Sequence, residues 1–471
     1  MNTRCQALLS TERAVRRLGG ARTSGLHSST LVDLFRSDFR TRATEEKIRE
    51  FESTMGQASA TSRKGLAGCV PALADGEEVL IVNPGSKNWE HMPIEVPLRF
   101  PPGRHMGLEV VVRRGEPLPP SQIQIEVLGR HRDGSIREAT LVLEPTLGAR
   151  SVLGLGLLSS APDAPESGLA HEVHSVGTAS VQADFLSHRG GALESVCFPG
   201  LSASALFGTI SHGHFDAMAF SPDFYSGHVV ALNEHHEKKT DLTPVRLGID
   251  KARSGPVRIT LESQFDSSFG PWRKRYRLYR NSARIDIGHD LSFHEARLAS
   301  LRFGAVTLRP EAWDRDSLRY GTVNGGAGVE WRGFGRGVSL AQSSAVSPSV
   351  TATSCLGATE GWVALADRER GLLISGDRSR AAVAPLLDFE EVDDSFFCRL
   401  SHTAAESDET RASFLRGRLG FDFSIEGFVA NDPQIFERAR QRLGLLRLLR
   451  YGCGQSRFPR PRRVKPRVDF A

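Results

Sequence analysis

The sequence predicts a mainly β protein, in which a small β domain precedes a large antiparallel β-supersandwich and short helical segments lie at both ends. Two observations lead to this fold class. Apolar residues recur at every second position through many short runs, which is typical of strands that bury one face. Glycine occurs 46 times in 471 residues, often between those runs, as turns between short strands require. A chain of this length exceeds one ordinary domain, so we expect more than one unit.

The clearest strand signal lies in residues 272–295, where two alternating runs flank a turn at Asn281-Ser282. Arginines take every second position of the first run. The second run alternates apolar and polar residues from Ile285 to Phe293. Alternation over this length predicts a half-buried antiparallel hairpin, with one face on a core and a polar face toward solvent or a ligand.

Helix and turn signals divide the rest of the chain. Residues 31–60 show helical periodicity, and Asp133-Gly134 is a strong hairpin signal in the first β unit. Asp432 followed by Pro433 is a favourable helix start. The predicted units are a helical and basic lead-in with a linker (1–76), a small β domain (77–158), a β-supersandwich (169–430), a C-terminal helix (431–453) and a basic disordered tail (454–471).

The formal net charge of +5 is unevenly distributed: residues 1–42 carry +5 and residues 432–471 carry +8, which leaves the body at −8. An acidic body does not suit nucleic acid, so we expect no such partner. No apolar run approaches the roughly 20 residues of a membrane span, so we expect no membrane partner. Six scattered cysteines without a secretory signal peptide predict a cytoplasmic protein, although the basic first 42 residues also resemble an organelle transit peptide.

Residues 211–239 are dense in histidine and hold five of the chain's fifteen. Their spacing matches no established metal pattern, so we expect neither a metal nor another cofactor. Histidines and carboxylates lining a sugar groove fit better, while solvated loop histidines remain an alternative. The glycine-rich stretch 321–328 lacks the motifs and the βαβ context of a phosphate loop.

The chemistry of sugars leaves two catalytic alternatives open. Glycoside hydrolysis needs two carboxylates across a groove, and a mutarotase-type isomerase needs a His and a Glu on facing strands. The sequence pairs none of these residues, so the catalytic residues stay unknown. The candidate carbohydrate-binding residues are His212, His214, Asp216, Asp223, Tyr225, His228, Asp286, His289, Glu295 and Trp331.

Three stretches resemble the C-terminal β-domains of family 38 α-mannosidase-type glycoside hydrolases. They are VLIVNPGSKNWEHMPIEVPL (79–98), PLPPSQIQIEV (117–127) and YRLYRNSARIDIGHDLSFHE (276–295). The first is similar to the family's valine-rich strand with Asn-Pro and a following Trp. The second is similar to its Pro-Gln strand segment, and the third to its strand pair with tyrosine, a small turn and Arg-hydrophobic-Asp. The resemblance covers roughly residues 77–430.

The resemblance implies a galactose mutarotase-like supersandwich after the small β domain. It also implies that the family's zinc ligands and nucleophilic aspartate lie in an N-terminal barrel with no counterpart before residue 77, so no catalytic residue is carried over. We therefore expect a non-catalytic β protein that binds a glycan, with a separate catalytic chain left open as a partner. The alternatives are an active sugar hydrolase, polysaccharide lyase or epimerase, or a non-sugar interaction protein using the basic residues 457–467.

Overall fold

The computed structural model describes residues 77–83, 87–162, 169–210, 225–235, 237–267, 270–323, 329–334, 354–355, 361–376, 384–392, 394–406, 413–430, 432 and 446–450. The predicted lead-in (1–76) and basic tail (454–471) lie outside these residues, and most of the predicted C-terminal helix does too. Strands dominate the described residues, which confirms the predicted mainly β class.

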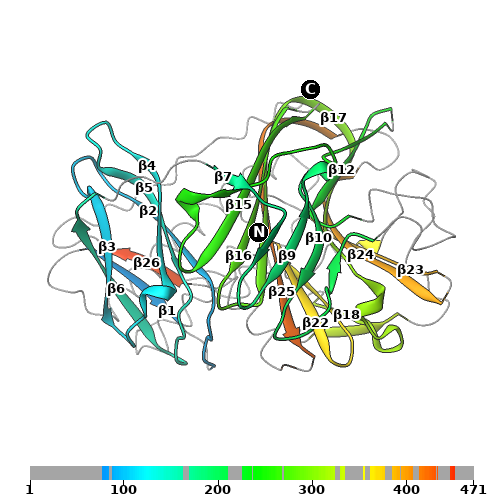
Figure 1. The fold of residues 1–471 in the computed structure, drawn as a ribbon, viewed down its shortest axis with the longest axis horizontal. Coiled ribbons are helices and arrows are strands. Elements are labelled where there is room, and N and C mark those ends of the chain that lie inside the picture. Colours follow the sequence, from blue (N-terminus) through cyan, green and yellow to red (C-terminus); the bar gives the residue numbers. More distant parts are fainter. Residues whose placement is uncertain are drawn as a thin grey trace, which may run out of the picture.

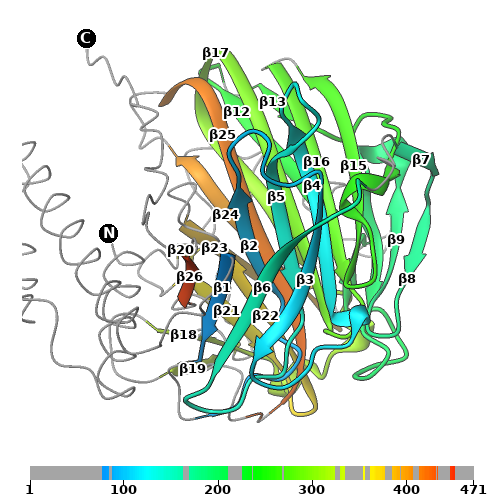
Figure 2. The same ribbon diagram turned by 90° about the vertical axis from the view of Figure 1, so that its left-hand side faces the viewer.

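Two small sheets form the first β unit, on the left of Figure 1 and in front in Figure 2. One has the order β26-β1-β6-β3, and the other β2-β5-β4. Their strands are β1 (Glu77–Val82), β2 (Ile94–Arg99), β3 (Gly107–Arg114), β4 (Ile123–Arg130), β5 (Ile136–Leu143), β6 (Val152–Ser160) and β26 (Leu446–Arg450). Alternate residues of both sheets share one buried cluster, in which Ile81 and Leu155 of the first sheet join Ile94 and Leu141 of the second.

Strand β26 corrects the predicted C-terminal helix. Residues 446–450 pair antiparallel with β1, and Leu448 lies opposite Leu80. The apolar residues of this stretch fit either a helical face or a short strand, and period alone does not separate the two in so short a run. Residues 446–450 form a strand because β1 is buried and needs a neighbour on this edge. Without one, the backbone N–H and C=O groups along that edge of β1 would stay unpaired.

The second unit is built on a 15-stranded sheet with the central order β19-β18-β21-β22-β25-β17-β16-β15-β14-β7. Those strands are β7 (Leu169–Glu172), β14 (Gly248–Asp250), β15 (Arg258–Ser267), β16 (Gly270–Tyr279), β17 (Arg284–Thr307), β18 (Arg319–Thr322), β19 (Glu330–Gly333), β21 (Trp362–Ala366), β22 (Arg370–Gly376) and β25 (Ser413–Val429). The side branches are β12 (His228–Asn233), β13 (Lys238–Thr240), β20 (Ser354–Cys355), β23 (Ala384–Val392) and β24 (Ser395–Glu406).

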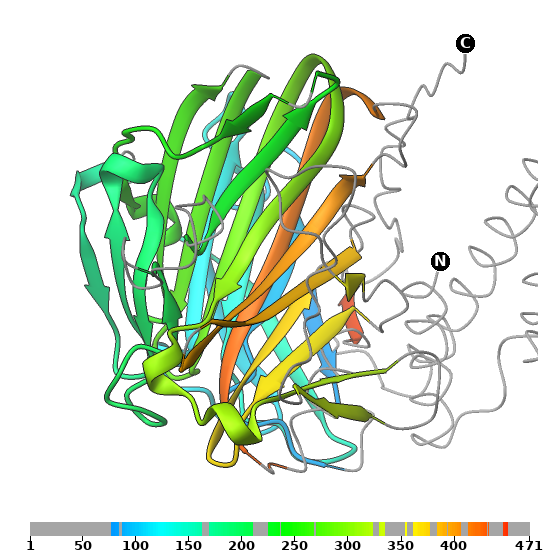
Figure 3. The ribbon, with the colours of Figure 1, turned by 90° about the vertical axis from the view of Figure 1, so that its right-hand side faces the viewer.

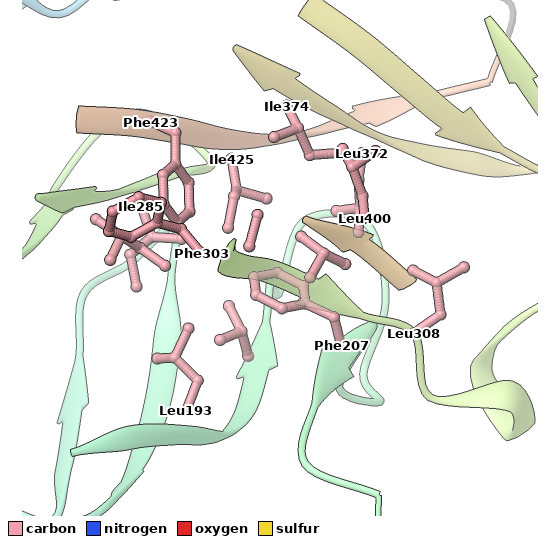
Figure 4. Packing of buried hydrophobic residues seen from close by; sticks show 14 of the residues in the cluster. Leu193, Phe207, Ile285, Phe303, Leu308, Leu372, Ile374, Leu400, Phe423 and Ile425 are labelled. Atoms are coloured by element: carbon pink, nitrogen blue, oxygen red, sulfur yellow. The ribbon is translucent and has the colours of Figure 1, made fainter. Parts of the chain in front are cut away.

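A fourth sheet, of four strands, packs against the large one, as Figure 3 shows. It contains β8 (Ser175–Gly177), β9 (Gln182–Leu186), β10 (Ala192–Cys197) and β11 (Phe207–Gly208). Its apolar residues and those of the large sheet form a single core, where Leu193 and Phe207 join Ile285 and Phe423 (Figure 4). At about 2 kcal/mol for each large apolar side chain buried, this core is the main source of the unit's stability.

The predicted hairpin is present as β16 and β17, and Trp272 lies opposite Leu291 in its register. Strand β17 is long and pairs with different neighbours along its length. Its first half lies between β16 and β25, whereas its second half lies between β12 and β24. A register shift between Phe293 and Ala296 marks the change. The two halves face each other across the core, so His289 and Phe303 have ring centroids 5.0 Å apart.

A buried polar network joins the small β unit to the outer side of this hairpin. Arg258 donates from Nε and Nη2 to the two carboxylate oxygens of Glu126, at 2.9 and 3.0 Å. Its Nη1 contacts Glu95 and donates to Tyr279 Oη at 3.2 Å. Glu144, which follows β5, accepts from Ser282 Oγ at 2.8 Å, so the small unit also holds the hairpin's turn. We call Glu95, Glu126, Glu144, Arg258, Tyr279, Ser282, Arg284 and Asp286 the interdomain network.

Candidate functional site

The structure describes six of the ten sequence-predicted site residues. His212, His214, Asp216 and Asp223 lie outside the described residues. Of the other six, four are buried and two are accessible.

Tyr225 and His228 lie inside the protein rather than on a ligand-facing surface. His228 begins β12 and sits opposite Gly304 of β17. A Cβ added at Gly304 would come within 2.3 Å of the imidazole, so the ring occupies the space that glycine leaves open. His228 is therefore packed inside the protein, and that it lines a sugar groove stays a prediction.

His289 also lies on the core side, with 1% of its surface exposed. Trp272, Phe303 and Phe423 surround it. Burial lowers the pKa of His289 well below its ordinary value, and the nearby Lys274 and His228 lower it further. The ring is therefore neutral and unsuited to a polar ligand face. The sequence allows this burial to be predicted, because His289 lies two residues after the buried Ile287 and therefore on the same side of the strand.

Asp286 lies on the polar side of β17, and Glu295 lies at its bend. Asp286 is buried in the interdomain network, where Arg284 Nε donates to it at 2.6 Å and Tyr279 Oη at 2.9 Å. Burial would raise the pKa of Asp286, but Arg284 outweighs this and holds it below its ordinary value. Glu295 is exposed at the bend of β17.

Trp331 is half-buried on β19, opposite Gly321 of β18. The guanidinium carbon of Arg319 lies 4.6 Å from the centroid of its indole ring. Trp331 packs against a small apolar cluster that includes Trp362 and Phe428. This strand stands at the edge of the large sheet, separated from β25 by β22, β21 and β18.

The residues that the structure does bring together lie on the outer side of β15, β16, β17 and β25. Alternation turns Lys274 and Tyr276 of β16 into the core and leaves Arg273, Arg275 and Arg277 on the opposite side. The strand register then places carboxylates beside these arginines. We call this surface the charged sheet face; its members are Asp250, Arg253, Glu262, Arg273, Arg275, Arg277, Asp290, Arg418 and Asp422.

Glu262 is the centre of the charged sheet face. Arg275 Nε donates to its Oε2 at 2.7 Å, Arg253 Nη1 approaches the same oxygen at 3.3 Å, and Arg273 Nε lies 3.2 Å from Oε1. Asp290 forms a second centre, since Arg418 binds both its oxygens, at 2.9 and 2.6 Å. These mutual contacts hold the charged groups in fixed orientations.

Part of the charged sheet face is open to solvent. The small β unit covers the outer side of β15 to β17 around Arg258, but the Arg273 and Arg418 side chains are 36% and 67% exposed. The other members are less exposed, and the side chains of Arg275 and Glu262 are each 13% exposed.

The described residues contain no group of three or more His, Cys, Asp or Glu side chains arranged to hold a metal ion. In the same part of the chain, no helix is long and apolar enough to cross a membrane. The chemistry that the charged sheet face offers is therefore hydrogen bonding and charge, with guanidinium donors and carboxylate acceptors.

Comparison with known proteins places this fold. No family model matches the chain, and no curated protein matches its sequence. Among solved structures it is similar to an α-mannosidase from Enterococcus faecalis V583, with a TM-score of 0.54 at 9% identity over 96% of this chain. The chain spans 58% of the length of that protein. The shared feature is the fold, since identity this low shows nothing more.

Two further matches are weaker. A glycosyl hydrolase family 38 protein from Enterococcus faecalis has a TM-score of 0.47 at 10% identity, covering 96% of this chain and 61% of its own. An Escherichia coli K12 protein assigned as an aldose 1-epimerase has a TM-score of 0.31 at 9% identity, covering 56% of this chain and all of its own. The first match confirms the resemblance that the sequence predicted, at the level of the fold.

Proposed function

We propose that this protein binds a glycan and that the charged sheet face is its binding site. The observation that carries the proposal is the partly open array around Glu262 and Asp290, in which guanidinium and carboxylate groups alternate across neighbouring strands. Sugar hydroxyls donate and accept hydrogen bonds, so such an array can engage several of them at once. Because the groups already hold one another in place, binding loses little side-chain freedom.

Binding fits the array better than proton transfer does. A glycosidase needs one carboxylic acid that carries a proton and can give it to the leaving group. Here each carboxylate accepts charge-assisted hydrogen bonds from arginine, an arrangement that suits a fixed negative charge. The fold neighbour is an α-mannosidase, so mannose-containing oligosaccharides are the first ligands to examine.

The test is calorimetric titration of the full chain with linear manno-oligosaccharides. Replacing both Arg273 and Arg418 by alanine removes accessible donors and should weaken binding by about tenfold or more. Arg332→Ala is the matched control, because Arg332 is also an exposed arginine beside a carboxylate, but on β19. Equal affinity in all three proteins would place the binding site elsewhere, and no binding by the unmodified chain to any saccharide would refute the proposal.

Hydrolysis is the second candidate, and one feature favours it. Glu262 on β15 and Asp290 on β17 are separated by β16 and offset by two residues in register, so their backbones lie about 12 Å apart. Both side chains project from the same side of the sheet, and the two carboxylates of inverting glycosidases likewise flank the sugar, about 6.5–9.5 Å apart. Turnover of aryl mannosides that Glu262→Gln and Asp290→Asn both abolish would support an enzyme, and absence of turnover alongside tight binding would reject it.

A further inference from the structure

Arginines outnumber carboxylates among the members of the charged sheet face. Three guanidinium groups, those of Arg253, Arg273 and Arg275, converge on the single carboxylate of Glu262. Arg253 has a further partner in Asp250 at 2.8 Å. Across the whole face, five arginines face four carboxylates.

Arg273 has the least satisfied contacts of the three. Its Nε lies 3.2 Å from Glu262 Oε1, but the contact lacks hydrogen-bond alignment, and this buried nitrogen has no hydrogen-bond partner among the described residues. Its neighbours across the strands are Gln264 and Asp290, and Asp290 is already held by Arg418. Arg273 is also the most exposed of the three arginines, at 36% of its side chain against 26% for Arg253 and 13% for Arg275, so an incoming oxygen acceptor reaches it most readily.

The surroundings of Arg275 point the same way. Burial lowers the pKa of Arg275, and although Glu262 raises it, the adjacent Arg253 and Arg277 lower it further. Burial is the largest of these influences, and Asp290 lies 3.9 Å from Arg275 Nη1 in addition to Glu262. The guanidinium groups of Arg253 and Arg277 still add positive charge around Arg275, and an anion against the exposed Arg273 would reduce the repulsion among them.

We infer that the glycan bound on the charged sheet face is anionic, with an acidic oxygen group seated against Arg273 and Arg275. This inference rests on the proposed glycan-binding function. The shared chemistry is an oxyanion on a sugar ring, supplied by a uronate carboxylate, a sulfate ester or a phosphate ester. The planar guanidinium fork matches each of these groups, and the remaining hydroxyls of the sugar fit Glu262 and Asp290 as acceptors.

The experiment titrates the full chain with charged and neutral partners of the same sugar. The probes are trigalacturonate and its methyl ester, mannose 6-phosphate and mannose, and a 6-sulfated disaccharide with its unsulfated form. We expect at least one charged probe to bind about tenfold tighter than its neutral partner, and added NaCl to reduce the difference. The pair with the largest difference identifies the source of the oxyanion.

Arg273→Gln should remove most of that difference. Arg332→Gln on β19 should change nothing. Neutral and charged probes that bind equally, with Arg273→Gln weakening both, would overturn the anion preference while leaving glycan binding in place. If free sulfate bound as tightly as the charged sugars, the inference that the anion belongs to a saccharide would be refuted. If no sugar bound at all, the proposed glycan-binding function would be refuted as well.

Discussion

Replacing Arg258 by methionine should destabilise the whole chain, because this arginine is the centre of the interdomain network. Only 2% of the residue is exposed, and it binds both carboxylate oxygens of Glu126, which is equally buried. Methionine fills a similar volume but leaves Glu126 with its charge and no cation. Breaking a buried pair in this way costs about 3–5 kcal/mol, which is a large share of the stability of a typical protein.

The matched control is the double variant Arg258→Met, Glu126→Met. Replacing both members of a buried ion pair by apolar residues is often close to neutral, so the double variant should recover to within about 1–2 kcal/mol of the unmodified chain. Urea unfolding followed by tryptophan fluorescence measures both free energies of unfolding. A single variant that loses less than about 1 kcal/mol, or a double variant no more stable than the single one, would refute the role assigned to Arg258.

The deficit of the single variant should also depend on pH. Burial raises the pKa of Glu126, and Arg258 is the main influence that lowers it, so removing the arginine raises this pKa further. A carboxyl whose folded-state pKa is raised takes up a proton more readily when folded, so folding gains stability as pH falls through that pKa. The Arg258→Met deficit should therefore be smaller at pH 5 than at pH 8, and a deficit that grows on acidification would contradict this account.

Three other changes test the interior. Lys274→Met should cost about 3–5 kcal/mol, because it leaves Asp241 fully buried without its cation; guanidinium unfolding measures the loss. Burial raises the pKa of Glu144, so its share of stability should increase as pH falls from 8 toward 5, and Glu144→Gln should flatten that slope in thermal melts. Gly227→Ala should cost at least about 1–2 kcal/mol, since its φ is +71° and the new Cβ would lie 2.8 Å from a buried tyrosine hydroxyl; Gly333→Ala, with open space, should be close to neutral.

Alternation in the sequence was sufficient to predict the β class and the central hairpin. The register of that hairpin follows the period-two pattern from Trp272 to Leu291. Strand β26 could not be predicted in the same way, because its only signal is a short apolar run. What makes it a strand is the unpaired edge of β1, more than 360 residues earlier in the chain, and such a long-range partner leaves no mark on local periodicity.

The site was harder to predict than the fold, and the reasons differ between residues. His289 could have been assigned to the core, because it shares the register of Ile287. Asp286 could not, since the sequence shows that it faces outward but not that the small β unit covers it. The arginines of β16 were visible as a period-two row, but Glu262 joins them only through the pairing of β15 with β16.

The central claim, that the charged sheet face binds a glycan, is tested most directly by a crystal structure of the full chain with its tightest-binding saccharide. We predict sugar oxygens within hydrogen-bonding distance of Arg273 and of the carboxylates of Glu262 or Asp290. A saccharide ordered elsewhere on the protein, with solvent alone over the charged sheet face, would contradict the claim.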